Sequence, residues 1–159
     1  MEAAVPPPGS GRRFRLYAIE AGGAAVLLIA AGLGNIVLEH PVSLLSHALA
    51  DPLARRAALG LLMACVVMAL VYSPWGMRSG GHFNPSITLA FWNLGKVALP
   101  DAIAYVTAQF AGALAGVGLI ALCFAPLVAH PAVHWYVTVP GSGGQLEAFF
   151  GEFAISFIG

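Results

Sequence analysis

The stretch GGHFNPSITLAFW, residues Gly80–Trp92, decides the fold. It places two glycines, a histidine, an asparagine and a proline inside a chain that is 59% hydrophobic. Asn is a favoured helix N-cap, and Pro suits the first helical position because its missing N–H would lack an intrahelical partner. Asn84-Pro85 therefore predicts the start of a helix. The Asn84 side-chain oxygen should accept from first-turn N–H groups, which leaves its NH2 group pointing outward as a donor.

The helix that follows is short. Its apolar residues, Ser86–Gly95, span about 15 Å at 1.5 Å per residue, half of the ~30 Å hydrocarbon core of a bilayer. Three runs elsewhere are long and apolar enough to cross a membrane: 16–38, 57–75 and 101–125, the last ending at Pro126. Because a half-length helix between two crossings cannot itself cross, residues 76–95 are predicted to form a re-entrant loop.

Composition agrees with a membrane protein whose solvent is the lipid bilayer. Only 9% of the 159 residues are charged, and the mean hydropathy is +0.84. The seven Lys and Arg residues are scattered and the net charge is zero, which disfavours a nucleic-acid partner. Cys65 and Cys123 lie in separate apolar runs without CxxC spacing, so we expect neither a disulfide framework nor a zinc site.

The remaining segments follow from these spans. Residues 1–15 are predicted to be a disordered cytoplasmic tail, 126–145 an outer loop, and 146–159 the start of a fourth helix. Positive charges gather on the side of the N-terminus, at Arg12, Arg13, Arg15, Arg78 and Lys96, against Arg55 and Arg56 on the other side. This bias predicts a multi-pass protein of the cell (inner) membrane with a cytoplasmic N-terminus.

The half-helix also predicts a function. Its N-terminal dipole, roughly half a positive charge, would lie near the bilayer midplane, where bare lipid cannot face it. We expect Gly80 and Gly81, in extended form, to present backbone carbonyls to a water-filled path. The predicted pore-lining residues are Gly80, Gly81, His82, Asn84, Pro85 and Ser86.

The residues around Asn84 resemble the signature motif of a known family. Ser79–Thr88 resembles the first signature loop of the aquaporins, the major intrinsic protein family, usually written SGxHxNPAxT. Glu20 with Gly22 and Gly23 resembles the family's first helix. Tyr105–Ala113 (YVTAQFAGA) resembles the third helix, and Glu152-Phe153 the start of the fourth.

The resemblance implies an all-α membrane protein with an aquaporin-like helical bundle. Residues 16–159 would be the first repeat: three full transmembrane helices, one re-entrant half-helix and the start of a fourth helix. Family members have six spanning helices and two half-helices in inverted repeats, and form tetramers with one pore per subunit. They are passive channels for water or small neutral solutes such as glycerol, so we expect neither enzymatic activity nor a cofactor.

Two departures from the family pattern stand out. Ser86 replaces the usual Ala, which adds a hydroxyl beside the cap. The second Asn-Pro loop would fall roughly 64 residues after Glu152, beyond Gly159, so we expect a truncated gene product or a partial record. Such a half chain should conduct nothing unless two copies pair head to tail. The family's aromatic filter position on the second helix falls on Met63 or Ala64, neither of which is aromatic; this favours a filter that is wider than a water-only filter or built differently from one.

Polar residues inside the spans are expected to have structural roles. Glu20, Gln109 and Glu152 should face the bundle interior and form hydrogen bonds. His82 is expected to pack the loop, with a pH response as the alternative. Gly112 and Gly116 form a GxxxG pattern, which predicts close helix packing.

Two other functions stay open at this point. One is a non-conducting membrane assembly module. The other is a membrane subunit with a histidine-ligated metal or haem, which the outer histidines disfavour because they share no helical spacing: His40, His47, His130 and His134.

Overall fold

The computed structural model describes residues 10–137, 139–140 and 143–158. These residues form helices and no strand, which confirms the all-α fold class. The elements are α1 (Ser10–Glu39), α2 (Leu44–Ala48), α3 (Pro52–Val71), α4 (Gly76–Ser79), α5 (Pro85–Asn93), α6 (Leu99–Val128), the 3₁₀ helix η1 (His134–Tyr136) and α7 (Gly144–Ile158). Among the described residues, α1, α3 and α6 are long and apolar enough to cross a membrane.

The helix ends differ from those expected. Because α1 begins at Ser10, residues 10–15 are helical instead of part of a disordered tail, and residues 1–9 lie outside the described residues. Helix α3 starts at Pro52, where the Asp51 carboxylate accepts from the Leu53 N–H. Helix α6 does not end before Pro126 but continues to Val128. A proline ring clashes with a straight helix, and a non-helical residue just before it, Phe124 (φ −134°, ψ 23°), bends the helix to admit it.

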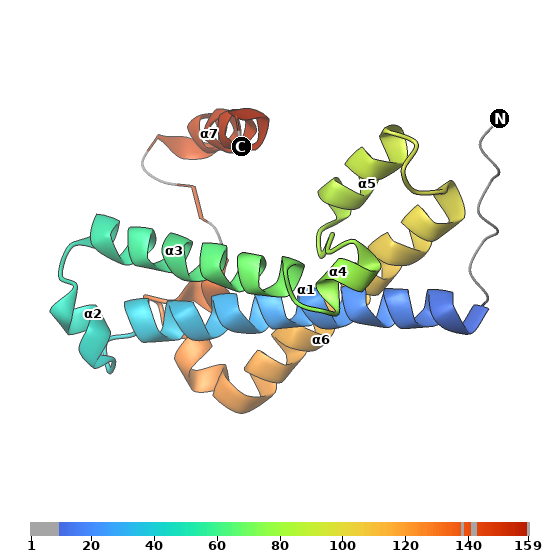
Figure 1. Ribbon diagram of the computed structural model, residues 1–159. Coiled ribbons are helices and arrows are strands. Elements are labelled where there is room, and N and C mark those ends of the chain that lie inside the picture. The colour runs from blue at the N-terminus through green and yellow to red at the C-terminus, as the bar shows by residue number, and fades with distance from the viewer. Residues whose placement is uncertain (1–9, 138, 141–142, 159) are drawn as a thin grey trace.

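The centre of the structure is the crossing of α1 and α6 (Figure 1). Gly112 and Gly116 of α6 lie against the backbone of Ala21 and Ala25 of α1. A Cβ atom at Gly112 would overlap the Ala21 carbonyl oxygen, and one at Gly116 would lie 2.6 Å from the Ala25 oxygen. The GxxxG pattern thus lets the two backbones approach closely, as the sequence predicted.

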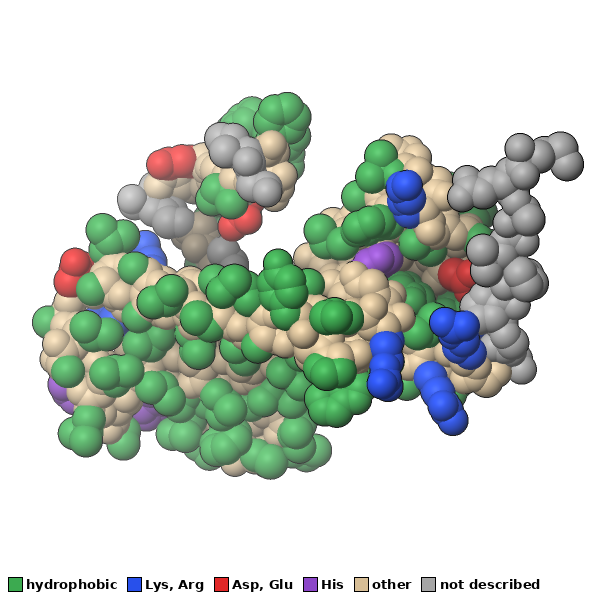
Figure 2. Space-filling model, viewed as in Figure 1, with side chains coloured by type: hydrophobic (Ala, Val, Ile, Leu, Met, Phe, Trp, Pro, Cys, Tyr) green, Lys and Arg blue, Asp and Glu red, His purple; other side chains and the backbone are tan. Residues whose placement is uncertain are grey.

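The third long helix packs less closely. Helix α3 runs antiparallel to α1 beside it (Figure 1), and none of its residues is buried. Apolar side chains cover much of the visible surface (Figure 2), as expected of a protein surrounded by lipid. Helix α7 stands apart from the three long helices (Figure 1).

A small apolar cluster closes the end of the bundle away from the N-terminus. Ile120 and Val128 of α6 and Val133 of the following turn are buried together, and Tyr136 packs against them. Burial raises the pKa of the Tyr136 phenol above its ordinary value, because the phenolate would lose its hydration.

The α1–α6 contact gives a first prediction. Gly112→Ala should lower the free energy of unfolding by about 1–3 kcal/mol, because its methyl group meets backbone that cannot rotate away. The matched control is Gly118→Ala on the same helix, where nothing beyond the helix's own neighbouring backbone lies within 4 Å of the added methyl. Thermal unfolding in detergent, followed by far-UV circular dichroism, compares the two. Equal stability of both variants would contradict the packing described.

Candidate functional site

Helix α5 is capped at both ends and is about half as long as a membrane is thick. Its nine residues span about 14 Å. At its start the Asn84 Oδ1 atom accepts from the Ser86 N–H at 2.8 Å, which confirms the predicted cap. At its end Gly95 has φ +69°, and Gly95 N–H and Lys96 N–H donate to Trp92 O and Phe91 O, both at 2.9 Å. This pair of bonds is a Schellman motif, so α5 stops before α6 begins.

The segment 76–96 enters and leaves at one end of the bundle. Within this segment Phe83 lies closest to the middle of the bundle. Its ring packs against Gly23, near the middle of the 30-residue α1. Arg78 and Lys96, near its two ends, share cavities with arginines of the first two turns of α1. Figure 1 shows the same path: α5 leaves the middle of α1 and returns toward its start. The segment is re-entrant with respect to α1.

The turn into α5 is tighter than expected. Gly80 and Gly81 have φ +97° and +63°, so they are left-handed and not extended as predicted. Phe83 is also left-handed, with φ +46°. Glycine tolerates this region without a steric penalty, and the turn lets the chain reverse between α4 and α5 within the five residues 80–84.

One carboxylate holds this turn in place. Glu20 of α1 is fully buried. Its Oε1 accepts from Ser79 Oγ at 2.7 Å and from His82 N–H at 3.2 Å. Its Oε2 accepts from Phe83 N–H at 2.6 Å and from Gln109 Nε2 at 2.8 Å. Four donors from the loop and from α6 therefore converge on a single side chain of α1.

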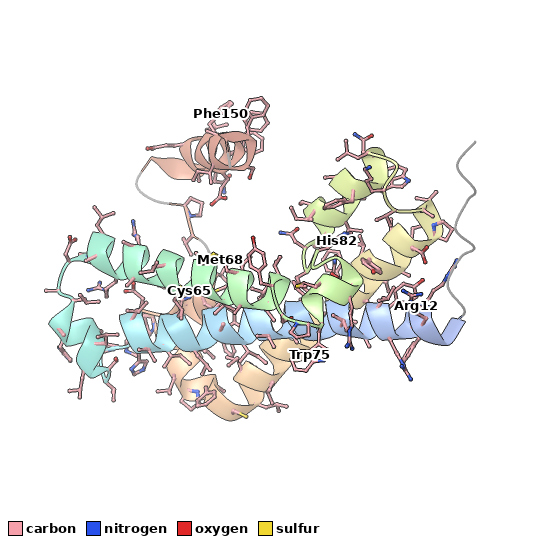
Figure 3. All side chains as sticks on the ribbon, viewed as in Figure 1. Arg12, Cys65, Met68, Trp75, His82 and Phe150 are labelled. Atoms are coloured by element: carbon pink, nitrogen blue, oxygen red, sulfur yellow. The ribbon has the colours of Figure 1, made fainter. Side chains whose placement is uncertain are left out.

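The network continues from Gln109 into α5. Gln109 Nε2 also lies 3.0 Å from the Thr88 hydroxyl, and this hydroxyl donates to the Asn84 carbonyl at 3.2 Å. His82 Nδ1 is 3.0 Å from the same hydroxyl. The His82 ring stacks on Phe91 with ring centres 4.8 Å apart, at the junction of the loop and α5 (Figure 3). His82 is buried and packs the loop, the first of the two roles considered for it.

The geometry accounts for a charge buried at this depth. A lone carboxylate in an apolar interior is strongly unfavourable, but an ionised one accepts about four hydrogen bonds, and Glu20 receives four. In return it satisfies two backbone N–H groups that a left-handed turn leaves without helical partners. Glu20 and Gln109 thus lie in the bundle interior with structural contacts, as expected.

The predicted pore residues separate into two groups. Asn84 and Ser86 are exposed at the start of α5, and the described residues offer no acceptor to the Asn84 NH2 group. His82 is buried inside the network. On α3, Met63 is half-buried and Ala64 is exposed.

One expectation was wrong. Glu152 is exposed on α7 and not directed into the bundle, because α7 stands apart from the helices that could supply donors (Figure 1).

Sequence reasoning did not assign roles to two network members. Ser79 donates to Glu20, and its carbonyl accepts from Tyr105 Oη at 2.8 Å. Thr88 links the helix start to Gln109. Both lie within quoted motifs, and Thr88 stands one helical turn after the cap, which is the signal that could have identified it.

The outer histidines form a pair that their spacing does not reveal. The rings of His40 and His130 are 4.6 Å apart. Each Nδ1 accepts from a backbone N–H two residues later, at 3.1 Å, so this atom is occupied. Within the described residues no three His, Cys, Asp or Glu side chains gather as metal ligands would.

The Glu20 network gives a second prediction. Glu20→Ala should lower the unfolding free energy by about 3–5 kcal/mol, because it leaves buried donors without partners. Glu39→Ala is the matched control, since among the described residues Glu39 bonds only Arg55, at the half-exposed end of α1. Thermal melts in detergent would measure both. A Glu20→Ala chain that melts together with the Glu39→Ala chain would show that the loop does not depend on this carboxylate.

Residues 15–158 match the family model described as Major intrinsic protein. The chain is 47% identical over 68 residues to the lens fiber major intrinsic protein of Gallus gallus, covering 43% of this chain and 24% of that protein. It is 35% identical over 109 residues to aquaporin NIP1-2 of Arabidopsis thaliana (67% and 37%) and 38% identical over 98 residues to aquaglyceroporin AqpS of Rhizobium meliloti (62% and 39%).

The chain thus matches between about a quarter and two fifths of the length of these relatives. The family match covers nearly all described residues, including the three apolar helices and the re-entrant segment between them. The chain is a multi-pass membrane protein, and it belongs to the major intrinsic protein family.

Proposed function

We propose that this chain supplies one wall of a passive membrane pore for water and small neutral solutes such as glycerol. The observation that carries the proposal is the braced half-helix, whose cap begins level with the middle of α1 and leaves the Asn84 amide exposed. An ordinary capped helix has no reason to stop at this depth, where only a polar path can accept its positive end. Membership of the family and the names of the relatives, aquaporin and aquaglyceroporin, support the same function.

The mechanism follows from the chemistry of the half-helix start. The Asn84 NH2 group donates to a passing water or hydroxyl, while its oxygen is occupied by the Ser86 N–H. Carbonyls around Gly80–His82 accept, and Pro85 and Ser86 complete the wall beside the cap. Cations, including protons, are opposed by the partial positive charge of the helix end. No covalent step or cofactor is involved.

The proposal also includes the repeat, the filter position, the oligomeric state and the orientation in the membrane. Residues 16–159 form the first of two inverted repeats, and a second repeat supplies the opposite wall. The filter position on α3 is Met63 or Ala64, neither of which is aromatic, which favours passage of glycerol. The assembled protein is a homotetramer in the cell (inner) membrane. Its N-terminus is cytoplasmic, because the arginines and Lys96 at that end outnumber those at the other.

A chimera tests the function. The corresponding half of aquaglyceroporin AqpS would be replaced by residues 15–158 of this chain, and permeability to water and glycerol measured by stopped-flow light scattering of proteoliposomes. We expect flux of at least one of the two solutes, and on the order of a tenfold loss in Asn84→Leu, which removes a midplane donor worth about 1.4 kcal/mol.

The matched control is Asn93→Leu at the other end of α5, where no cap is lost. A chimera that inserts and remains helical but conducts neither solute would contradict the proposal and favour a non-conducting assembly module. Equal flux in the Asn84→Leu and Asn93→Leu chimeras would contradict the role of the cap.

A further inference from the structure

A cavity of about 770 Å³ lies at the end of the bundle where α1 begins, apart from the half-helix cap. Its walls come from the first three turns of α1 and from α4. Three arginines line it, Arg12, Arg15 and Arg78, together with the apolar side chains of Leu16, Ile19 and Met77. Figure 2 shows basic side chains gathered at this end, and Figure 3 labels Arg12 there.

The arginines near the start of α1 lie on different faces of the helix. Residues 12, 15, 16 and 19 follow helical spacing on the face that lines the cavity. Arg13 lies on another face and pairs with Asp101 at 3.7 Å. Among the described residues the only ion pairs are those of Arg13 and Arg55, so the three cavity arginines have no carboxylate partner there.

The cavity therefore concentrates three positive charges with nothing described to balance them. The start of α1 adds to this, since Gly11 lines the cavity and first-turn N–H groups lack intrahelical acceptors. Such a helix end favours anions. Arginine presents a planar fork of donors that matches two oxygens of a phosphate at once.

The apolar half of the lining identifies the source of the anion. Leu16, Ile19 and Met77 give a free phosphate nothing to contact, whereas they suit the upper part of an acyl chain. Met77 is 68% exposed, so its side chain is free to contact an acyl chain. The cavity thus places positive charge beside apolar surface, which matches the phosphate group and the adjoining acyl chains of a phospholipid.

We propose that this cavity, formed by Arg12, Arg15, Arg78, Leu16, Ile19 and Met77, binds the phosphodiester headgroup of an anionic phospholipid from the leaflet at the N-terminal end of the bundle. The bound lipid bridges α1 and α4. Because α4 leads directly into the loop held by Glu20, the lipid also stabilises the entry to the re-entrant segment. The inference does not depend on conduction.

Native mass spectrometry of the full chain in detergent tests the site. Phosphatidylglycerol and phosphatidylcholine with the same acyl chains would be titrated separately, and the first bound lipid followed. We expect the unaltered chain to bind phosphatidylglycerol at least about tenfold more tightly than phosphatidylcholine. Inorganic phosphate and glycerol phosphate should not displace it. Equal affinity for the two lipids, or displacement by either free phosphate, would overturn the proposal.

Variants separate a defined site from general surface charge. Arg78→Gln should weaken phosphatidylglycerol binding about fivefold, and the triple variant R12Q/R15Q/R78Q on the order of a hundredfold. Lys96→Gln is the matched control, because it removes one positive charge at the same end of the bundle but lines a different cavity. It should leave binding nearly unchanged. Weakening by Lys96→Gln equal to that by Arg78→Gln, with helicity preserved in both, would assign the binding to diffuse charge and overturn the proposal.

Discussion

The Glu20 carboxylate meets a constraint set by the re-entrant loop. A loop that turns inside a membrane exposes backbone N–H groups where water is scarce, and each needs an acceptor. The Glu20 carboxylate accepts from the N–H groups of His82 and Phe83 while Ser79 and Gln109 supply the remaining donors. The hydrogen bonds from the loop compensate for burying the charge, and the carboxylate supplies the acceptors that the turn lacks. The carboxylate and the loop therefore stabilise one another.

Close packing of α1 and α6 makes this arrangement possible. Gln109 reaches Glu20 because Gly112, one turn later on α6, brings the helix backbone against Ala21. Phe83 reaches the middle of α1 because Gly23 leaves room for its ring. The small residues therefore do more than join helices. They set the depth at which the half-helix starts, and with it the position of the exposed Asn84 amide.

Much of this could be predicted from local chemistry. Asn84-Pro85 predicted a helix start and the cap bond, and the length of the apolar run predicted that the helix would be short. Contacts between residues far apart in the sequence were harder to predict. Nothing in the sequence around His40 indicates its pairing with His130, and Gly80 and Gly81 turned out left-handed because the turn is tighter than an extended strand allows. Pro126 is typical of a helix end, but a bend at Phe124 admits it within α6.

Helix α5, braced by Glu20, should begin at mid-membrane depth. Depth-dependent quenching by brominated lipids measures this, with a single tryptophan placed at Ile87 or at Leu94 after Trp75, Trp92 and Trp135 are changed to Phe. Both positions are exposed in the structure, at 44% and 67%. Position 87 should be quenched most by bromines near the bilayer centre, and position 94, about 10 Å away along the helix, by those near the headgroups. Two tryptophans at the same shallow depth would contradict it.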